Sequence, residues 1–261
     1  MAAETKRARR ISIISGKGGV GKTVITANLA AALHSIGRRV LVIDADLGLA
    51  NLDIVLGVAP ELTIQDFLSG SHSLEEVVLK TSKGFDLLPA GSGLMEGTIL
   101  TPTLAQKMNS ILHRLEECYD AILFDAGAGI GDVVLFFANL ADEILLVVTP
   151  EPTSLMDSYA TIKVLHQFYG RNEFLLLVNQ ASPTCPEQVG SSVVSHLQNV
   201  ISRFIDPGKS GEIRLHLAGS IPTDPAIPRA ISERQLLAEN SPRSPSVSLM
   251  KHVAGVLHSR M

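Results

Sequence analysis

The 261-residue sequence contains few of the residues that mark several common classes of protein. It has no tryptophan, and its two cysteines, Cys118 and Cys185, lack C-x-x-C spacing, which disfavours a metallocentre-maturation role. No apolar run reaches the length of a transmembrane helix. The net charge of -4 provides no overall basic field, so DNA is not an expected partner. With 46% hydrophobic residues, the chain is nevertheless typical of a globular domain with a substantial core.

A glycine-rich stretch lies between an apolar run at 11–14 and a helical pattern at 24–33. It matches G-x-x-x-x-G-K-[ST] in the strand–loop–helix context that a phosphate-binding loop requires, which disfavours a turn that binds nothing. Glycines let backbone N–H groups approach phosphate oxygens, and the following helix N-terminus favours the same anion. Lys22 is expected to reach the β- and γ-phosphates, and the Thr23 hydroxyl to bind Mg²⁺. The predicted nucleotide contacts here are Gly16, Lys17, Gly18, Gly19, Val20, Gly21, Lys22, Thr23 and Val24.

Carboxylates stand at the ends of two further predicted strands. Asp44 and Asp46 follow the aliphatic run at 40–43, and Asp125 ends the run at 119–125. Open α/β sheets bind ligands at the carboxyl ends of their strands, so these acids are expected near the phosphate loop. An aspartate in such a position also commonly caps a turn, and only the phosphate loop upstream makes the pattern specific.

The remaining sequence alternates between aliphatic runs and helical patterns. Strands are expected near 85–89, 144–148, 174–178 and 215–221, with helices between them, one of them starting at Thr101-Pro102. This pattern predicts an α/β, single-domain P-loop NTPase fold with a mostly parallel, doubly wound sheet and helices on both faces. We expect residues 1–10 to form a basic flexible tail and residues 11–261 to form the domain.

Lys17 is not required by the general phosphate-loop pattern. With it, the loop resembles the deviant Walker A loop of the MinD/ParA ATPases, and the resemblance extends over nearly the whole chain. The resemblance implies ATP or ADP with Mg²⁺ as ligands and an ATP-dependent homodimer, in which Lys17 reaches the partner's ATP. The stretches Gly48-Leu49-Ala50-Asn51 and Asp125-Ala126-Gly127-Ala128-Gly129 look closer to the FlhG/FleN flagellar-number regulators than to MinD.

The resemblance also assigns catalytic and metal-binding roles. Lys17, Lys22 and Asp46 would be catalytic, with Asp46 orienting the attacking water. Thr23, Asp46 and Asp125 would hold Mg²⁺, partly through water. Asp44 would lie near the metal without binding it directly.

Further residues are assigned to the base and ribose of the nucleotide. By resemblance, Glu151 would contact the ribose of the partner's nucleotide, and Asn179 would read adenine, although a turn-forming Asn is the alternative. Backbone groups around Pro222, Thr223 and Asp224 would complete the adenine pocket.

The C-terminal pattern leaves two roles open. Apolar residues share one helical face, which we interpret as the last packed helix of the domain; the alternative is peripheral membrane contact of the MinD kind. These residues are Met250, Val253, Ala254, Leu257 and Met261.

The resemblance predicts a cytoplasmic switch with slow ATP hydrolysis, which would regulate flagellar number, placement or gene expression. Its protein partner would be an FlhF-like GTPase or a flagellar transcription regulator. The first alternative is a MinD-like septum-site or ParA-like cargo-positioning ATPase. The second is a nucleotide-binding anti-activator without useful hydrolysis. The intact set of Lys22, Thr23, Asp46 and Asp125 counts against the second alternative.

Overall fold

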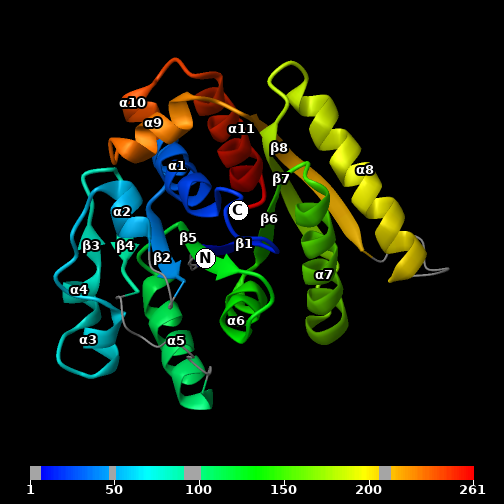
Figure 1. Ribbon diagram of the computed structural model, residues 1–261. Helices are drawn as coiled ribbons and strands as arrows, with labels where there is room; N and C mark the ends of the chain where they lie inside the picture. Colours follow the sequence, from blue (N-terminus) through cyan, green and yellow to red (C-terminus); the bar gives the residue numbers. More distant parts are fainter. Residues whose placement is uncertain (1–6, 47–50, 91–100, 206–212) are drawn as a thin grey trace, which may run out of the picture.

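Aliphatic strands separated by helices build one eight-stranded sheet covered on both faces (Figure 1). The computed structural model describes residues 7–46, 51–90, 101–205 and 213–261. The strand order is β3-β4-β2-β5-β1-β6-β7-β8, and every pairing is parallel except β3 with β4. The strands are β1 (Arg9–Ser15), β2 (Val40–Ala45), β3 (Leu79–Lys80), β4 (Asp86–Leu88), β5 (Ala121–Ala128), β6 (Glu143–Val148), β7 (Glu173–Ala181) and β8 (Arg214–Pro222).

The helices divide into two layers, one on each face of the sheet (Figure 1). The longer ones are α1 (Lys22–Ser35), α5 (Pro102–Leu115), α6 (Asp132–Leu140), α7 (Pro152–Tyr169), α8 (Pro186–Phe204) and α11 (Pro245–Ser259). The short ones are α2 (Leu52–Leu56), α3 (Ile64–Leu68), α4 (Leu74–Val77), α9 (Ala226–Ser232) and α10 (Leu237–Asn240).

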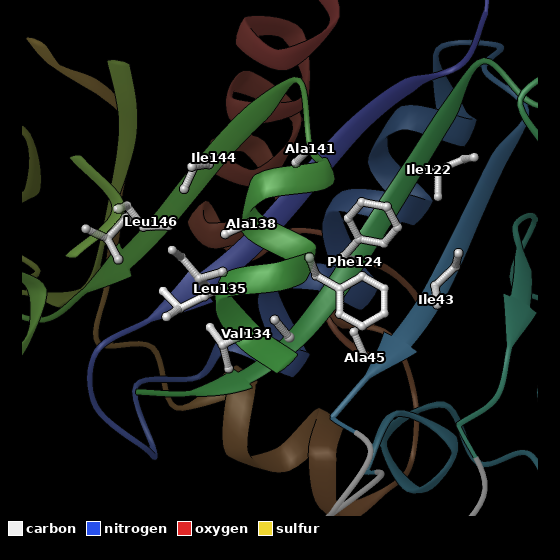
Figure 2. Close-up of a cluster of buried hydrophobic side chains, with 14 of the residues drawn as sticks. Ile43, Ala45, Ile122, Phe124, Val134, Leu135, Ala138, Ala141, Ile144 and Leu146 are labelled. Atoms are coloured by element: carbon white, nitrogen blue, oxygen red, sulfur yellow. The ribbon is translucent and has the colours of Figure 1, made fainter. Parts of the chain in front are cut away.

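Central strands are buried on both faces because successive side chains enter opposite cores. On β5, Leu123 lies in the core beneath α1 and α11, whereas its neighbour Phe124 lies beneath α6. Figure 2 shows residues of α6, among them Val134 and Ala138, lying over Phe124 and the adjacent strands. This packing holds Phe124 in the core and thereby positions the next residue on β5, Asp125.

The predicted mostly parallel, doubly wound α/β sheet is confirmed, with two details that differ from expectation. The first strand begins at Arg9 and Ala8 is fully buried, so the proposed boundary between a tail at 1–10 and a domain at 11–261 is wrong at these residues. Arg9 and Arg10 enter the strand because carboxylates neutralise them, a long-range contact that a local basic pattern does not reveal. The two-residue strand β3 was not predicted either.

Ion pairs line the edge of the sheet where the parallel strands begin. Arg7 contacts Asp142 at 2.6 Å, Arg9 contacts Glu143 at 2.8 Å, and Arg10 contacts Glu116 at 3.2 Å. Further pairs join Arg39 with Asp120, and Arg260 with Glu143 and Glu173. Each of these acids therefore has at least one arginine partner.

The C-terminal helix α11 packs on the domain. Met250, Val253, Ala254 and Leu257 are at most 3% exposed, and the helix contacts α1 and β8. The preferred interpretation of this helix is therefore confirmed, because the apolar face that a lipid surface would need is covered by the core. Within the described ranges, no helix is long and apolar enough to span a membrane.

Candidate functional site

The glycine-rich loop joins β1 to α1 at the edge of the sheet where the parallel strands end. At Gly16, a Cβ would come within 2.4 Å of the Asp157 backbone in α7, so the loop can approach α7 only without a side chain here. Gly21 has a φ of 90°, and a Cβ there would lie 2.6 Å from the Asn179 side chain. The loop conformation therefore needs glycine at both positions.

Neighbouring strands hold the loop in place by hydrogen bonds. The Ser15 hydroxyl donates to the Lys17 carbonyl at 2.9 Å, and the Gly129 amide donates to the Ser15 carbonyl at 2.8 Å. Asn179, at the end of β7, donates its side-chain amide to the Val20 carbonyl at 2.7 Å. Its amide nitrogen thus holds the predicted phosphate-binding loop, a role absent from the sequence-based interpretation.

Asp44 and Asp125 stand directly opposite each other on the neighbouring strands β2 and β5. Both are buried, with exposed fractions of 4% and 2%. Burial, together with the charge of Asp125, raises the pKa of Asp44 to about 8. Burial also raises the pKa of Asp125. Two adjacent buried carboxylates form a site that a divalent cation would neutralise.

The start of α1 supplies the groups that face Asp125. The charge of Lys22 acts to lower the pKa of Asp125, as do hydrogen bonds from the hydroxyls of Thr23 and Thr26. The Thr26 hydroxyl donates to Asp125 at 2.8 Å and also lies 3.0 Å from the Lys22 carbonyl. Thr26 was missed from the sequence, although its spacing of three residues from Thr23 places both on one helix face.

Asp46 follows the end of β2 and lies beside the last residues of β5. Its backbone amide donates to Asp44 at 3.1 Å, and its carboxylate carbon lies 3.6 Å from where a Cβ on Gly127 would be. Asp46 therefore lies next to Gly127, at the same edge as Asp125. In the predicted Gly48-Leu49-Ala50-Asn51 signature, residues 48–50 lie outside the described residues.

Lys17 is held within its own chain. Its ammonium contacts Glu151 at 2.6 Å and the Thr153 hydroxyl at 3.0 Å, at the start of α7. Lys17 and Glu151, both predicted to meet a partner's nucleotide, therefore pair with each other in the single chain. Their side chains are 36% and 57% exposed, so solvent has access to the contact.

A pocket of about 270 Å³ opens beside the loop. Four predicted base-site residues line it together with Val24: Asn179, Pro222, Thr223 and Asp224. Its apolar wall comes from Ile227, Pro228 and Ile231 around α9 and from Met250 of α11, none of which the sequence indicated. Such a mostly apolar pocket with a few polar groups suits a planar heterocyclic base.

The residues present suit a magnesium ion that also binds water and substrate phosphates. Among the described residues, no cluster of three or more His, Cys, Asp or Glu forms a cage for a metal ion. The site instead offers the Thr23 hydroxyl beside the buried Asp44–Asp125 pair, next to a loop shaped for phosphate. Mg²⁺ commonly binds through one or two protein groups, waters and substrate phosphates, and this donor set suits that mode.

Comparisons with known proteins agree with this geometry. Residues 8–175 match the family described as AAA domain. The chain is 39% identical to the antiactivator FleN of Pseudomonas aeruginosa, covering 94% of this chain and 84% of FleN. It is 33% identical to the flagellum site-determining protein YlxH of Helicobacter pylori, over 96% and 82% of the two chains.

Solved structures of similar fold agree with the architecture of the sheet and helices. The cell division ATPase MinD of Pyrococcus furiosus superimposes with a TM-score of 0.77 at 28% identity, covering 97% of this chain and all of MinD. MinD of Pyrococcus horikoshii, complexed with Mg-ADP, gives a TM-score of 0.73 at 28% identity and covers 96% of each chain.

Proposed function

This chain belongs to the MinD/ParA family of P-loop proteins, in the FlhG/FleN-like group, and from that premise we propose that it is an ATP-dependent dimerising switch. The observation that carries the proposal is the convergence of Lys17, Lys22, Asp46 and the Asp44–Asp125 pair on one edge of the sheet. The relationship to FleN and YlxH supports regulation of flagellar number, placement or gene expression as its task.

Nucleotide binding follows from the loop and the pocket beside it. The loop amides and Lys22 would hold the phosphates of ATP or ADP, and the pocket lined by Asn179 and Pro222 would take the base. Thr23 would bind Mg²⁺ directly and Asp125 through water, with Asp44 behind them. The metal, when bound, would neutralise charge on the phosphates and on the buried acids.

Hydrolysis would depend on positioning, because phosphoryl transfer needs little covalent participation from the protein. Asp46 would accept a hydrogen bond from the attacking water and aim it at the γ-phosphate. Lys22 would stabilise the charge that develops on the phosphate oxygens.

Dimerisation would involve a change of partners for Lys17. In the single chain its charge is satisfied by Glu151 and Thr153. A γ-phosphate presented by a second copy would compete for the same ammonium group, whereas ADP lacks that phosphate. A homodimer that forms with ATP and not with ADP would follow.

Size-exclusion chromatography with light scattering tests the switch on the wild type, Asp46→Ala and Lys22→Gln, each with Mg²⁺ and either ADP or ATP. We expect a dimer only with ATP, most abundant in Asp46→Ala because its hydrolysis is blocked while its phosphate contacts remain. Lys22→Gln is the control and should stay monomeric in both nucleotides. A monomer for Asp46→Ala with ATP would overturn the proposal.

The output of the switch would be a protein contact in the cytoplasm. FleN is named an antiactivator, which favours a flagellar transcription regulator as the partner of this chain over an FlhF-like GTPase. Co-purification with each candidate in ATP and in ADP would decide between them. A phosphate-release assay without turnover, alone or with the partner, would favour an anti-activator that works without hydrolysis.

A further inference from the structure

The carboxylate of Asp224 makes three hydrogen bonds with protein groups. Ser244 and Ser246, at the start of α11, both donate hydroxyl hydrogens to its Oδ2, the latter at 2.7 Å. The Ala226 amide, at the start of α9, donates to Oδ1 at 2.9 Å. Although burial alone would raise it, these hydrogen bonds hold the pKa of Asp224 below its usual range. The charged carboxylate is therefore held in place by groups from the starts of α9 and α11.

The two helices that meet at Asp224 also wall the base pocket. Ile227 and Ile231 come from α9 and Met250 comes from α11, while the backbone of 222–224 forms the strand side. Ser246 is fully buried and Met250 lies one helical turn after it, so the hydroxyl and the pocket wall move together. Hydrogen bonds through Asp224 thus join the starts of α9 and α11, which also share an apolar cluster that contains Ala230 and Val247.

We propose that Asp224, Ser244 and Ser246 form a positioning clamp that sets the width of the base pocket and so determines how strongly the base, as distinct from the phosphates, contributes to binding. The proposal deepens the nucleotide function proposed above and rests on it. The hydroxyls of Ser244 and Ser246 do not line the pocket, so they would act on the base through Ile227, Ile231 and Met250. Loss of a charge-assisted hydrogen bond would let the walls separate while the phosphate loop stays intact.

The test compares two ligands that share phosphates and differ in the base. Calorimetric titration measures binding of MgATP and of magnesium tripolyphosphate to the wild type, Ser246→Ala and Asp224→Asn. We expect both variants to bind MgATP about tenfold more weakly, whereas their affinity for tripolyphosphate stays within about twofold of the wild type. Ser241→Ala is the matched control, because its hydroxyl, in the same loop, contacts Asn240 and not Asp224.

The outcomes separate the clamp from the function on which it rests. A wild type that binds neither ligand would overturn the nucleotide function and the clamp together. A wild type that binds ATP normally, with Ser246→Ala equal to Ser241→Ala, would overturn the clamp alone. Equal losses for ATP and tripolyphosphate would show general destabilisation and would also overturn it. Ser246→Ala is the milder change, since it removes one hydroxyl and leaves the carboxylate in place.

Discussion

The buried acids at the two edges of the central sheet have opposite electrostatic surroundings. At the edge where the parallel strands begin, Glu116, Asp142 and Glu143 each contact an arginine. At the edge where they end, Asp44 faces Asp125, and burial raises the pKa of both. Arginines of the same chain neutralise the acids at the first edge, whereas at the second edge Lys22 and two threonine hydroxyls only partly offset the burial of Asp125.

Arginine partners favour the charged forms of the acids at the starting edge, whereas burial disfavours the charged forms of Asp44 and Asp125 at the ending edge. A site that binds a metal and a nucleotide needs such an unfavourable arrangement, since a ligand stabilises the protein only through interactions that the free protein lacks. Substitutions at the two edges should therefore have opposite consequences.

The largest effect is expected for Lys22→Gln at the ligand edge. This change removes the cation that faces Asp125 and that we propose to bind the phosphates, so the affinity for MgATP should fall about 100-fold. Isothermal titration calorimetry measures the affinity. Lys80→Gln, on the exposed strand β3, is the matched control and should bind like the wild type. Unchanged affinity in Lys22→Gln would mean that the loop does not bind phosphate.

Asp44→Asn should raise the free energy of unfolding, which is the opposite of the usual effect of a substitution. The pKa of Asp44 is raised in the folded protein, so its contribution to stability is largest at low pH and is lost as the pH rises toward 8. In nucleotide-free protein with EDTA, Asp44→Asn should raise the free energy of unfolding by about 2 kcal/mol at pH 8 and change it little at pH 4. Urea unfolding at both pH values measures this. Equal effects at the two values would contradict it.

Glu116→Gln, at the starting edge, should instead lower the free energy of unfolding. Glu116 is 6% exposed and lies within 3.3 Å of Arg7 and 3.2 Å of Arg10, so losing its charge leaves two guanidinium groups without this partner. We expect a loss of about 1.5 kcal/mol in the free energy of unfolding at pH 7, with unchanged MgATP affinity. The neighbouring Glu117→Gln, on the exposed surface, is the control and should be neutral.

The smallest effect is expected for Asp120→Asn. Hydrogen bonds from Arg39 lower the pKa of Asp120, so its contribution is present at neutral pH and is lost as the pH falls below about 4. Because the pair is partly exposed, the loss should be about 1 kcal/mol at pH 7. Its pH dependence should run opposite to that of Asp44→Asn, and a loss that grew in acid would contradict the comparison.

The sequence predicted most of the ligand edge because its determinants are local. Buried parallel strands appear as aliphatic runs, and the carboxyl ends of such strands meet at one edge, which brought Asp44, Asp46 and Asp125 to the phosphate loop. The glycines were predicted as a motif, although the reason for Gly16, its approach to α7, became visible only in three dimensions.

What the sequence did not predict depends on contacts between distant segments. The ordered start at Arg7 to Arg10 needs carboxylates more than 100 residues away, and the clamp at Asp224 joins two loops about 20 residues apart. Lys17 and Glu151 were both identified, but their mutual contact was not, since a pattern assigns each residue a role without showing what it contacts.

The two-residue strand β3 has a consequence for association. It ends the sheet in an antiparallel turn and carries Lys80, whose side chain is 76% exposed. Long, uncharged edge strands invite edge-to-edge pairing between copies, and short strands bearing lysine discourage it. Such a short edge strand offers little free backbone at which β-sheet aggregation could begin. The protein could then associate with a second copy through its nucleotide without also pairing along this edge strand.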